Sequence, residues 1–297
     1  MKEFVTSLMM AWGNFLSIPC PKKIWDQNLK KEMLAKLPII GLIAGFLSFL
    51  LSYVLNSLHV PISVAAFFLT LYTFGISGFM HADGFMDCCD AILSRRDLAE
   101  RQRILKDSRV GAFAVISMIL MALGTFSAFF AIQERLFASS VAISYTVASK
   151  ILPIVTALPL IMISVISRAT AGSCVLGMNP MSTSQYAEEN AEEHAKENIR
   201  QSNIKYINTI LIVVLLILLI VMLAVFILAA RISVKTALIF LVHLLIPTVM
   251  TLLATRVTAG LASKNLGGMS GDIAGFSICM GELIGLITLA LMRWLVL

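Results

Sequence analysis

The apolar stretch INTILIVVLLILLIVMLAVFILAA, residues 207–230, decides the fold of this chain. It runs for 24 residues without a charged side chain and offers polar side chains only at Asn208 and Thr209. A helix rises about 1.5 Å per residue, so this length crosses the roughly 30 Å hydrocarbon core of a bilayer. A water-exposed helix needs a polar face, which this stretch lacks. Residues 207–230 are therefore predicted to form a transmembrane helix.

Similar blocks fill most of the remaining sequence. Of the 297 residues, 59% are apolar and 13% are charged, compared with about 25% charged in soluble domains, which excludes a soluble or disordered protein. The block 138–167 contains Lys150, Pro153 and Pro159, so it is either one kinked span or two shorter helices. The sequence therefore predicts one all-α membrane domain over residues 1–297, a polytopic bundle of seven transmembrane helices, or eight if that block splits. The candidate spans are 38–58, 61–79, 110–132, 138–167, 207–230, 236–254 and 274–296.

The basic residues are distributed unevenly about these spans. Of the 23 Lys and Arg residues, 18 fall on one side of a seven-span arrangement and four on the other, with Lys150 inside a span. By the positive-inside rule the basic side faces the cytoplasm, which predicts a multi-pass protein of the inner cell membrane. The same rule explains the net charge of +6, so no nucleic-acid partner is expected. The first apolar stretch, 4–19, has no small-residue cleavage site, so the N-terminus is expected to be retained.

Most acidic residues lie on the basic side as well. The polar segments 81–109, 168–205 and 255–273 all face that compartment and are predicted to be cytoplasmic catalytic loops. Channels and inverted-repeat transporters place ionisable groups near the bilayer midplane, whereas the charged residues within the candidate spans here are Lys150, Glu282 and, near the end of the last span, Arg293. This arrangement favours an enzyme, and a membrane transporter is the alternative.

Three aspartates follow the second candidate span, in the segment Gly78-Phe-Met-His81-Ala-Asp83-Gly84-Phe-Met-Asp87-Cys-Cys-Asp90. Their spacing of i, i+4 and i+7 places them on one face of a helix. Carboxylates this close repel one another unless a cation binds between them, and oxygen ligands of this kind suit Mg2+. The pattern predicts a metal site, and a plain solvated helix face is the alternative.

His81 precedes the first aspartate by two residues. On a continuous helix its side chain would point away from the aspartates, whereas an extended lead-in would turn it toward them. It is a candidate catalytic acid or base, and an ordinary hydrogen-bonding histidine at the membrane interface is the alternative.

Basic residues follow the acidic segment and end in the run Lys106-Asp107-Ser108-Arg109-Val-Gly111. Phosphoryl transfer requires cations that neutralise charge on the phosphate oxygens. Lys106 and Arg109 are therefore predicted to bind substrate phosphate. The alternative is that these residues only set the topology.

A glycine-rich turn, Leu266-Gly267-Gly268-Met269-Ser270-Gly271-Asp272, precedes the last candidate span. Its backbone N–H groups can converge on an anion, and the following helix adds its N-terminal dipole. Gly267, Gly268 and Gly271 are predicted to bind phosphate, and a simple tight turn is the alternative.

These motifs resemble the adenosylcobinamide-GDP ribazoletransferase, or cobalamin synthase, family. The resemblance covers nearly the whole chain but departs in the middle, at Arg168-Ala-Thr-Ala-Gly172 and Gly177-Met-Asn-Pro180, so the role of that loop stays open. The motifs that carry it are His81-x-Asp83-Gly84-x-x-Asp87-x-x-Asp90, Lys106-Asp107-Ser108-Arg109-x-Gly111, and Leu266-Gly267-Gly268-x-x-Gly271-Asp272 with Glu282.

The resemblance implies a magnesium-dependent phosphoryl transfer. The ribose 3'-hydroxyl of α-ribazole, or of its 5'-phosphate, attacks the cobinamide-side phosphorus of adenosylcobinamide-GDP, and GMP leaves. Adenosylcobalamin or its 5'-phosphate is formed. Candidate partners besides these substrates and the lipid bilayer are a second copy of the chain and other cobalamin-assembly enzymes.

The resemblance also implies roles for the motif residues. The hydroxyl proton would pass to His81 or to one aspartate, and phosphate would contact Lys106 and Arg109. The Mg2+ ligands would be Asp83, Asp87 and Asp90, with Asp107 and Asp272 as further ligands. A CDP-alcohol phosphotransferase-like membrane enzyme is the alternative, but its Asp-Gly pair is followed by Ala-Arg, where this chain has Phe85-Met86-Asp87.

Overall fold

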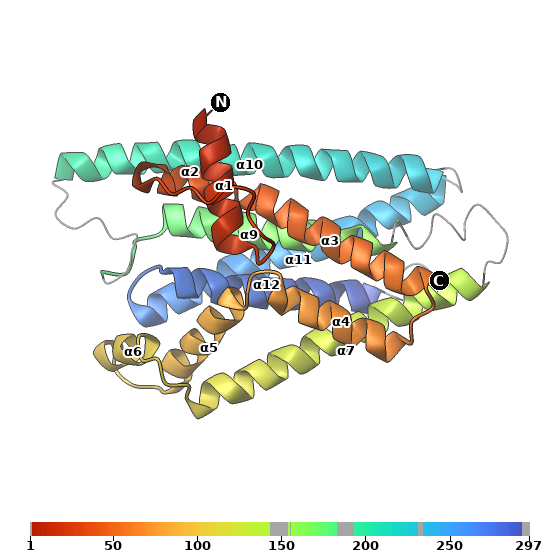
Figure 1. Cartoon of the computed structure of the whole chain (residues 1–297), viewed down its shortest axis with the longest axis horizontal. Coiled ribbons are helices and arrows are strands. Elements are labelled where there is room, and N and C mark those ends of the chain that lie inside the picture. Colours follow the sequence, from red (N-terminus) through yellow and green to blue (C-terminus); the bar gives the residue numbers. More distant parts are fainter. Residues whose placement is uncertain (1, 143–153, 155, 183–192, 231–233, 293–297) are drawn as a thin grey trace.

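The computed structural model describes residues 2–142, 154, 156–182, 193–230 and 234–292. Within these residues the chain forms helices and no strand, so the prediction of an all-α bundle is confirmed. The long helices run side by side along the longest axis, and the first helix crosses them (Figure 1). The helices are α1 (Lys2–Phe15), the short η1 (Gln27–Leu29), α2 (Lys30–Leu34), α3 (Leu37–Ser57), α4 (Ile62–Gly75), α5 (Met80–Leu93), α6 (Leu98–Leu105), α7 (Ala112–Ala142), α9 (Pro159–Gly177), α10 (Glu193–Ala230), α11 (Val234–Leu266) and α12 (Gly271–Leu291).

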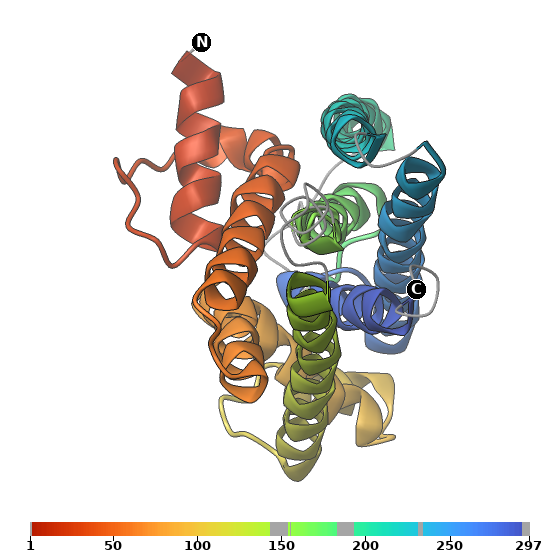
Figure 2. The same cartoon turned by 90° about the vertical axis from the view of Figure 1, so that its right-hand side faces the viewer.

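Two helices form the centre of the bundle. Seen along its long axis, α9 and α12 lie inside a ring formed by α3, α4, α7, α10 and α11 (Figure 2). Of the α9 span, 78% is buried, compared with 22% of the α10 span, whose apolar side chains face outward. The outer helices therefore present apolar surface all round, as lipid contact requires.

Six described helices are long and apolar enough to cross a membrane, and a seventh span results if the bent pair α4 and α5 counts as one. The two helices of this pair meet at an angle of 80°. The candidate span 61–79 is therefore corrected: its helix ends at Gly75, and the chain turns through Gly78 and Phe79, whose φ angles are +62° and +64°. Gly tolerates such an angle freely, whereas Phe79 does so at a cost in strain.

The candidate span 138–167 is also corrected. Residues 138–142 continue α7, and the next span is α9, which begins at Pro159, a residue suited to the first turn of a helix. Lys150 and Pro153 lie outside the described residues. The predicted count of seven spans is met with the bent pair included, and an eighth span is not found in the described part of the chain.

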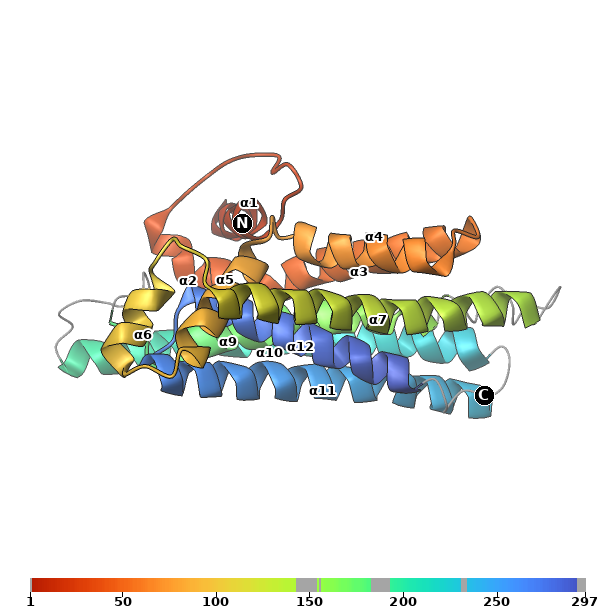
Figure 3. The ribbon, with the colours of Figure 1, turned by 90° about the horizontal axis from the view of Figure 1, so that it is seen from below.

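Each predicted polar loop is shorter than expected because helices extend into it. Segment 81–109 contains most of α5 and all of α6, 168–205 begins with the end of α9, and 255–273 begins with the end of α11. The described residues between these helices lie at one end of the bundle, beside α6 (Figure 3). The backbone of Met181 donates to Met269 O at 2.9 Å, and Gln102 Nε2 donates to Leu266 O at 2.8 Å. All three segments therefore meet.

Arg168 was expected in a loop, and this expectation is wrong. It lies in α9, is 1% exposed, and forms an ion pair with Glu282 of α12. Ser167 Oγ donates to the same carboxylate at 3.0 Å, and Arg168 Nη1 also donates to Ser164 O at 3.3 Å. A charge buried in a membrane bundle is stabilised only by such pairing.

The basic end of the bundle is expected to face the cytoplasm, which cysteine labelling can test. In a thiol-free background, cysteines at Arg103 and Lys264, both exposed in the structure, should be protected from an impermeant reagent in intact cells. A cysteine at Arg135, near the other end of α7, should react. Labelling of the Arg103 site from outside would reverse the orientation.

Candidate active site

The bend after α4 lays α5 at the basic end of the bundle, where its acidic face begins. Asp83 lies in the first turn of α5 and is exposed, and Asp87 lies one turn further and is half-buried. No hydrogen bond within the described residues engages either carboxylate. Both side chains are thus available to a ligand.

Helix α12 brings a fourth carboxylate to this face. A Cβ atom on Gly84 would come within 2.7 Å of Asp272 O, so only glycine permits this approach of α5 to α12. The rings of Phe85 and Phe276 stack beside the contact, with centroids 5.7 Å apart. Asp87 consequently interacts electrostatically with Asp83, Asp272 and Asp90. The sequence could not reveal that Gly84 allows α12 to approach α5 closely enough to bring Asp272 to the cluster.

Asp90 is engaged differently from the other aspartates. Its Oδ2 accepts a hydrogen bond from Gly111 N at 2.5 Å, and its Oδ1 accepts one from Ala114 N at 3.0 Å. Both donor N–H groups belong to the first turn of α7 or to the residue that precedes it. The carboxylate therefore serves as the N-terminal cap of that helix.

Asp107 and Arg109 bind each other in the structure. Arg109 Nη2 and Nε lie 2.8 and 3.1 Å from the Asp107 carboxylate, which also accepts from Arg109 N at 3.1 Å. These hydrogen bonds lower the pKa of Asp107 to about 2, so it remains ionised at any physiological pH. The Arg109 side chain is 82% exposed, and Lys106 is exposed at the C-cap of α6. Both cations face outward, where a phosphate can reach them.

The glycine-rich turn is held by α6 and by the segment after α9. Gly267 and Gly268 have φ angles of +81° and +144°, which side chains other than glycine rarely adopt. The amides of Gly268 and Met269 donate to Ser263 O and Asn179 O, at 2.9 and 2.8 Å. Those two N–H groups are thus occupied, and Gly271 opens α12 behind the cap Ser270.

Sequence reasoning missed the two α6 residues that hold this turn. Arg101 Nη1 lies 3.1 Å from Asn265 Oδ1 and 3.3 Å from Asn265 O, and Gln102 donates to Leu266 O. Arg101 is one of the basic residues that follow the acidic segment, and nothing in the sequence predicts that it binds Asn265; no local pattern marks Gln102. Their partners are 164 residues away in the sequence.

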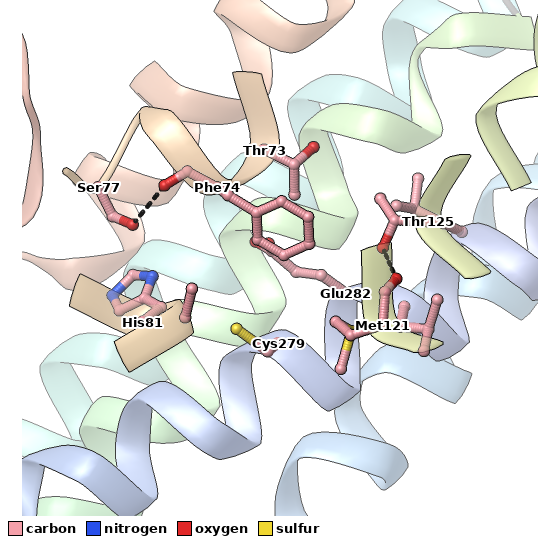
Figure 4. A pocket seen from close by; sticks show the side chains of 11 residues that line it. Thr73, Phe74, Ser77, His81, Met121, Thr125, Cys279 and Glu282 are labelled. Carbon is pink, nitrogen blue, oxygen red and sulfur yellow. Dashed lines mark hydrogen bonds between the residues drawn. The ribbon is translucent and has the colours of Figure 1, made fainter. Parts of the chain in front are cut away.

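His81 does not join the aspartates. It lies on the inner side of α5, 8% exposed, and lines a cavity between α4, α5, α7 and α12 (Figure 4). Glu282 and Cys279 of α12 and Thr125 of α7 line the same cavity. The helix is continuous from Met80, so the extended lead-in that would turn His81 toward Asp83 is absent from this described segment.

The donor chemistry of the cluster fits Mg2+. Among the described residues, no three His, Cys, Asp or Glu side chains converge into a finished metal cage. Mg2+ is usually bound by one or two carboxylates together with water and substrate phosphates, so a finished cage is not required. Asp83, Asp87 and Asp272 supply hard oxygen ligands from two helices that Gly84 holds in contact.

Comparison with known proteins identifies the family. The family described as Cobalamin-5-phosphate synthase matches residues 7–290. The chain belongs to the cobalamin-5-phosphate synthase family. Membership makes this protein a transferase that acts in the assembly of the cobalamin nucleotide loop.

Its relatives carry a single name. The adenosylcobinamide-GDP ribazoletransferases of Clostridium perfringens strain 13 and Clostridium botulinum strain Alaska E43 are each 32% identical over 291 residues, which covers 98% of this chain and 100% and 99% of theirs. The enzyme of the same name from Halalkalibacterium halodurans is 39% identical over 122 residues, 41% of this chain and 46% of its own. No solved structure matches the chain significantly.

Proposed function

We propose that the protein transfers the adenosylcobinamide phosphate group of adenosylcobinamide-GDP to the ribose hydroxyl of α-ribazole or α-ribazole 5'-phosphate. The hydroxyl oxygen forms a bond to the cobinamide-side phosphorus, the bond from that phosphorus to the bridging oxygen breaks, and GMP leaves. The relatives carry the name of this reaction. The single observation that supports it here is the meeting of carboxylates from α5 and α12 with exposed cations beside them.

Magnesium would be held by Asp83, Asp87 and Asp272. The ion supplies charge neutralisation on the diphosphate oxygens, where negative charge accumulates during an in-line displacement. Lys106 and Arg109 would bind phosphate oxygens, and Asp107 orients the Arg109 guanidinium. Because His81 lies on the inner face of α5, the hydroxyl proton would pass to an oxygen of Asp83 or Asp87 that does not contact the metal.

The site would open to the cytoplasm from the inner membrane. Six or seven apolar spans and the gathering of basic residues at the end that carries the aspartates support this placement. Both substrates are water-soluble, and their reacting groups, a diphosphate and a ribose hydroxyl, are polar. An active site at the membrane surface lets them enter without crossing the bilayer.

Purified protein in detergent, incubated with adenosylcobinamide-GDP, α-ribazole and Mg2+, is expected to release GMP in step with a new corrinoid product. Omitting α-ribazole, or chelating Mg2+ with EDTA, should abolish GMP release. Hydrolysis of the GDP group at the same rate without α-ribazole would contradict the assignment as a transferase.

Arg109→Lys separates phosphate binding from topology. Lysine keeps the positive charge but lacks the planar fork that contacts two oxygens at once. We expect normal insertion and a loss of about tenfold or more in kcat/KM, equivalent to about 1.4 kcal/mol. Arg103→Lys is the matched control, because the Arg103 side chain is exposed on α6 and forms its ion pair with Glu100. Parental kinetics in both variants would leave Arg109 with a topological role alone.

A further inference from the structure

We propose that Asp90 is a positioning residue and not a metal ligand: its carboxylate fixes the start of α7 and, through it, the segment that carries Lys106 and Arg109. This inference rests on the proposed function for the role of those two cations. The spacing of the three aspartates groups Asp90 with Asp83 and Asp87, whereas the hydrogen bonds separate it from them.

The first N–H groups of a helix have no partner within the helix and carry partial positive charge. Gly111 precedes α7 and has no side chain that could cap it. Asp90 supplies the cap from 21 residues earlier in the chain, with one oxygen on Gly111 N and the other on Ala114 N. Both oxygens therefore accept a hydrogen bond from the backbone.

A metal ion would compete with these hydrogen bonds. Each carboxylate oxygen has two lone pairs, so Mg2+ bound through Asp90 would share an oxygen that already accepts a hydrogen bond from Gly111 N or Ala114 N, and would weaken that hydrogen bond. Asp83 and Asp87 bear no such cost, because no hydrogen bond in the described part of the chain holds their carboxylates.

Gly111 is matched to this cap. A Cβ atom on Gly111 would overlap the Asp90 carboxylate, so any side chain there displaces it. The contact can therefore be tested by changing either Asp90 or Gly111. A substitution at Gly111 leaves every carboxylate of the cluster unchanged.

The cap also fixes the far end of the basic segment. At its near end, α6 is held to the glycine-rich turn by Gln102, and Lys106 is the C-cap of α6. At its far end, Asp90 holds Gly111. Lys106 and Arg109 lie between these two anchors, so loss of the cap releases the segment from α5 without removing a charge from it.

The test compares Asp90→Asn, Asp90→Ala and Asp83→Asn in purified full-length protein, with Mn2+ as the metal probe and amide hydrogen exchange as a second readout. We expect both Asp90 variants to keep Mn2+ affinity within about twofold, while exchange at residues 111–115 accelerates by about tenfold or more in Asp90→Ala, because a helix cap protects the first turn. Asparagine keeps one acceptor oxygen and should show an intermediate effect. Asp83→Asn should weaken Mn2+ binding and leave this exchange unchanged.

The inference is overturned if Asp90→Asn weakens Mn2+ binding as much as Asp83→Asn, or if exchange at 111–115 is unchanged in Asp90→Ala. Neither readout needs turnover, so failure of the proposed reaction would be seen separately. If the parent binds no Mn2+, the metal assignment fails and the exchange readout alone decides the role of Asp90.

A double-mutant cycle with Gly111→Ala identifies the contact itself. With the Asp90 side chain removed, a methyl group at position 111 has room, so Gly111→Ala should add little to the exchange and kinetic effects of Asp90→Ala. Fully additive effects would show that the two residues act independently and would contradict the cap as the cause.

Discussion

Replacing Asp83 or Asp87 with asparagine is expected to lower turnover by about a hundredfold or more, while the amount of protein in the membrane stays near normal. Both side chains lie at the aqueous end of the bundle and pack no core. Their loss removes charge stabilisation of the transition state and not apolar contacts. The measurement is GMP release at saturating Mg2+, normalised to the protein recovered.

Asp97→Asn is the matched control for these variants. Asp97 caps α6 by accepting a hydrogen bond from Glu100 N at 2.9 Å, and asparagine caps helices about as well. It should therefore retain nearly parental turnover. Activity within threefold of the parent in both Asp83→Asn and Asp87→Asn would remove these residues from the site.

Breaking the buried ion pair should have the largest effect on stability. Arg168→Met leaves the Glu282 carboxylate, whose side chain is 9% exposed, without its cation. Truncating one member of a buried pair typically costs about 3–5 kcal/mol. We expect a sharp fall in the thermal midpoint of the detergent-solubilised protein and low recovery from membranes.

The double variant Arg168→Met, Glu282→Gln is expected to recover most of the lost stability, because no unpaired charge remains. Arg231→Met, outside the described residues, serves as a control for the loss of one positive charge. If Arg168→Met were as stable as the parent, the pair would not contribute to holding α9 against α12.

Long uncharged runs predicted the spans well, because a membrane helix must satisfy its backbone internally and must be apolar along its length. The boundaries were less accurate, since α9 and α11 continue past their apolar parts, and α5 and α6 form within residues that read as a polar loop. Helical hydrogen bonds do not end where hydropathy changes. Arg168 reads as the first residue of a polar loop but lies within α9. Its ion-pair partner, Glu282, is 114 residues away in the sequence, so no local pattern predicts the pair.

The sequence predicted which residue types form the candidate site, but not which of these residues lie together. The i, i+4, i+7 spacing correctly placed three aspartates on one helix, α5. It could not show that Asp90 turns to the start of α7, or that Gly84 admits Asp272 to the cluster. Both facts depend on contacts between helices that are distant in the sequence. The bend between α4 and α5, at Gly78 and Phe79, likewise lies within a stretch that reads as one apolar span.

The central claim is that the group transferred contains the cobinamide-side phosphorus. The most direct test uses adenosylcobinamide-GDP labelled with 32P at that phosphorus, incubated with α-ribazole, Mg2+ and the purified protein. We predict that all of the label released from the substrate appears in the corrinoid product that contains α-ribazole, and that the GMP is unlabelled. Label in a guanosine nucleotide or in inorganic phosphate would contradict the account.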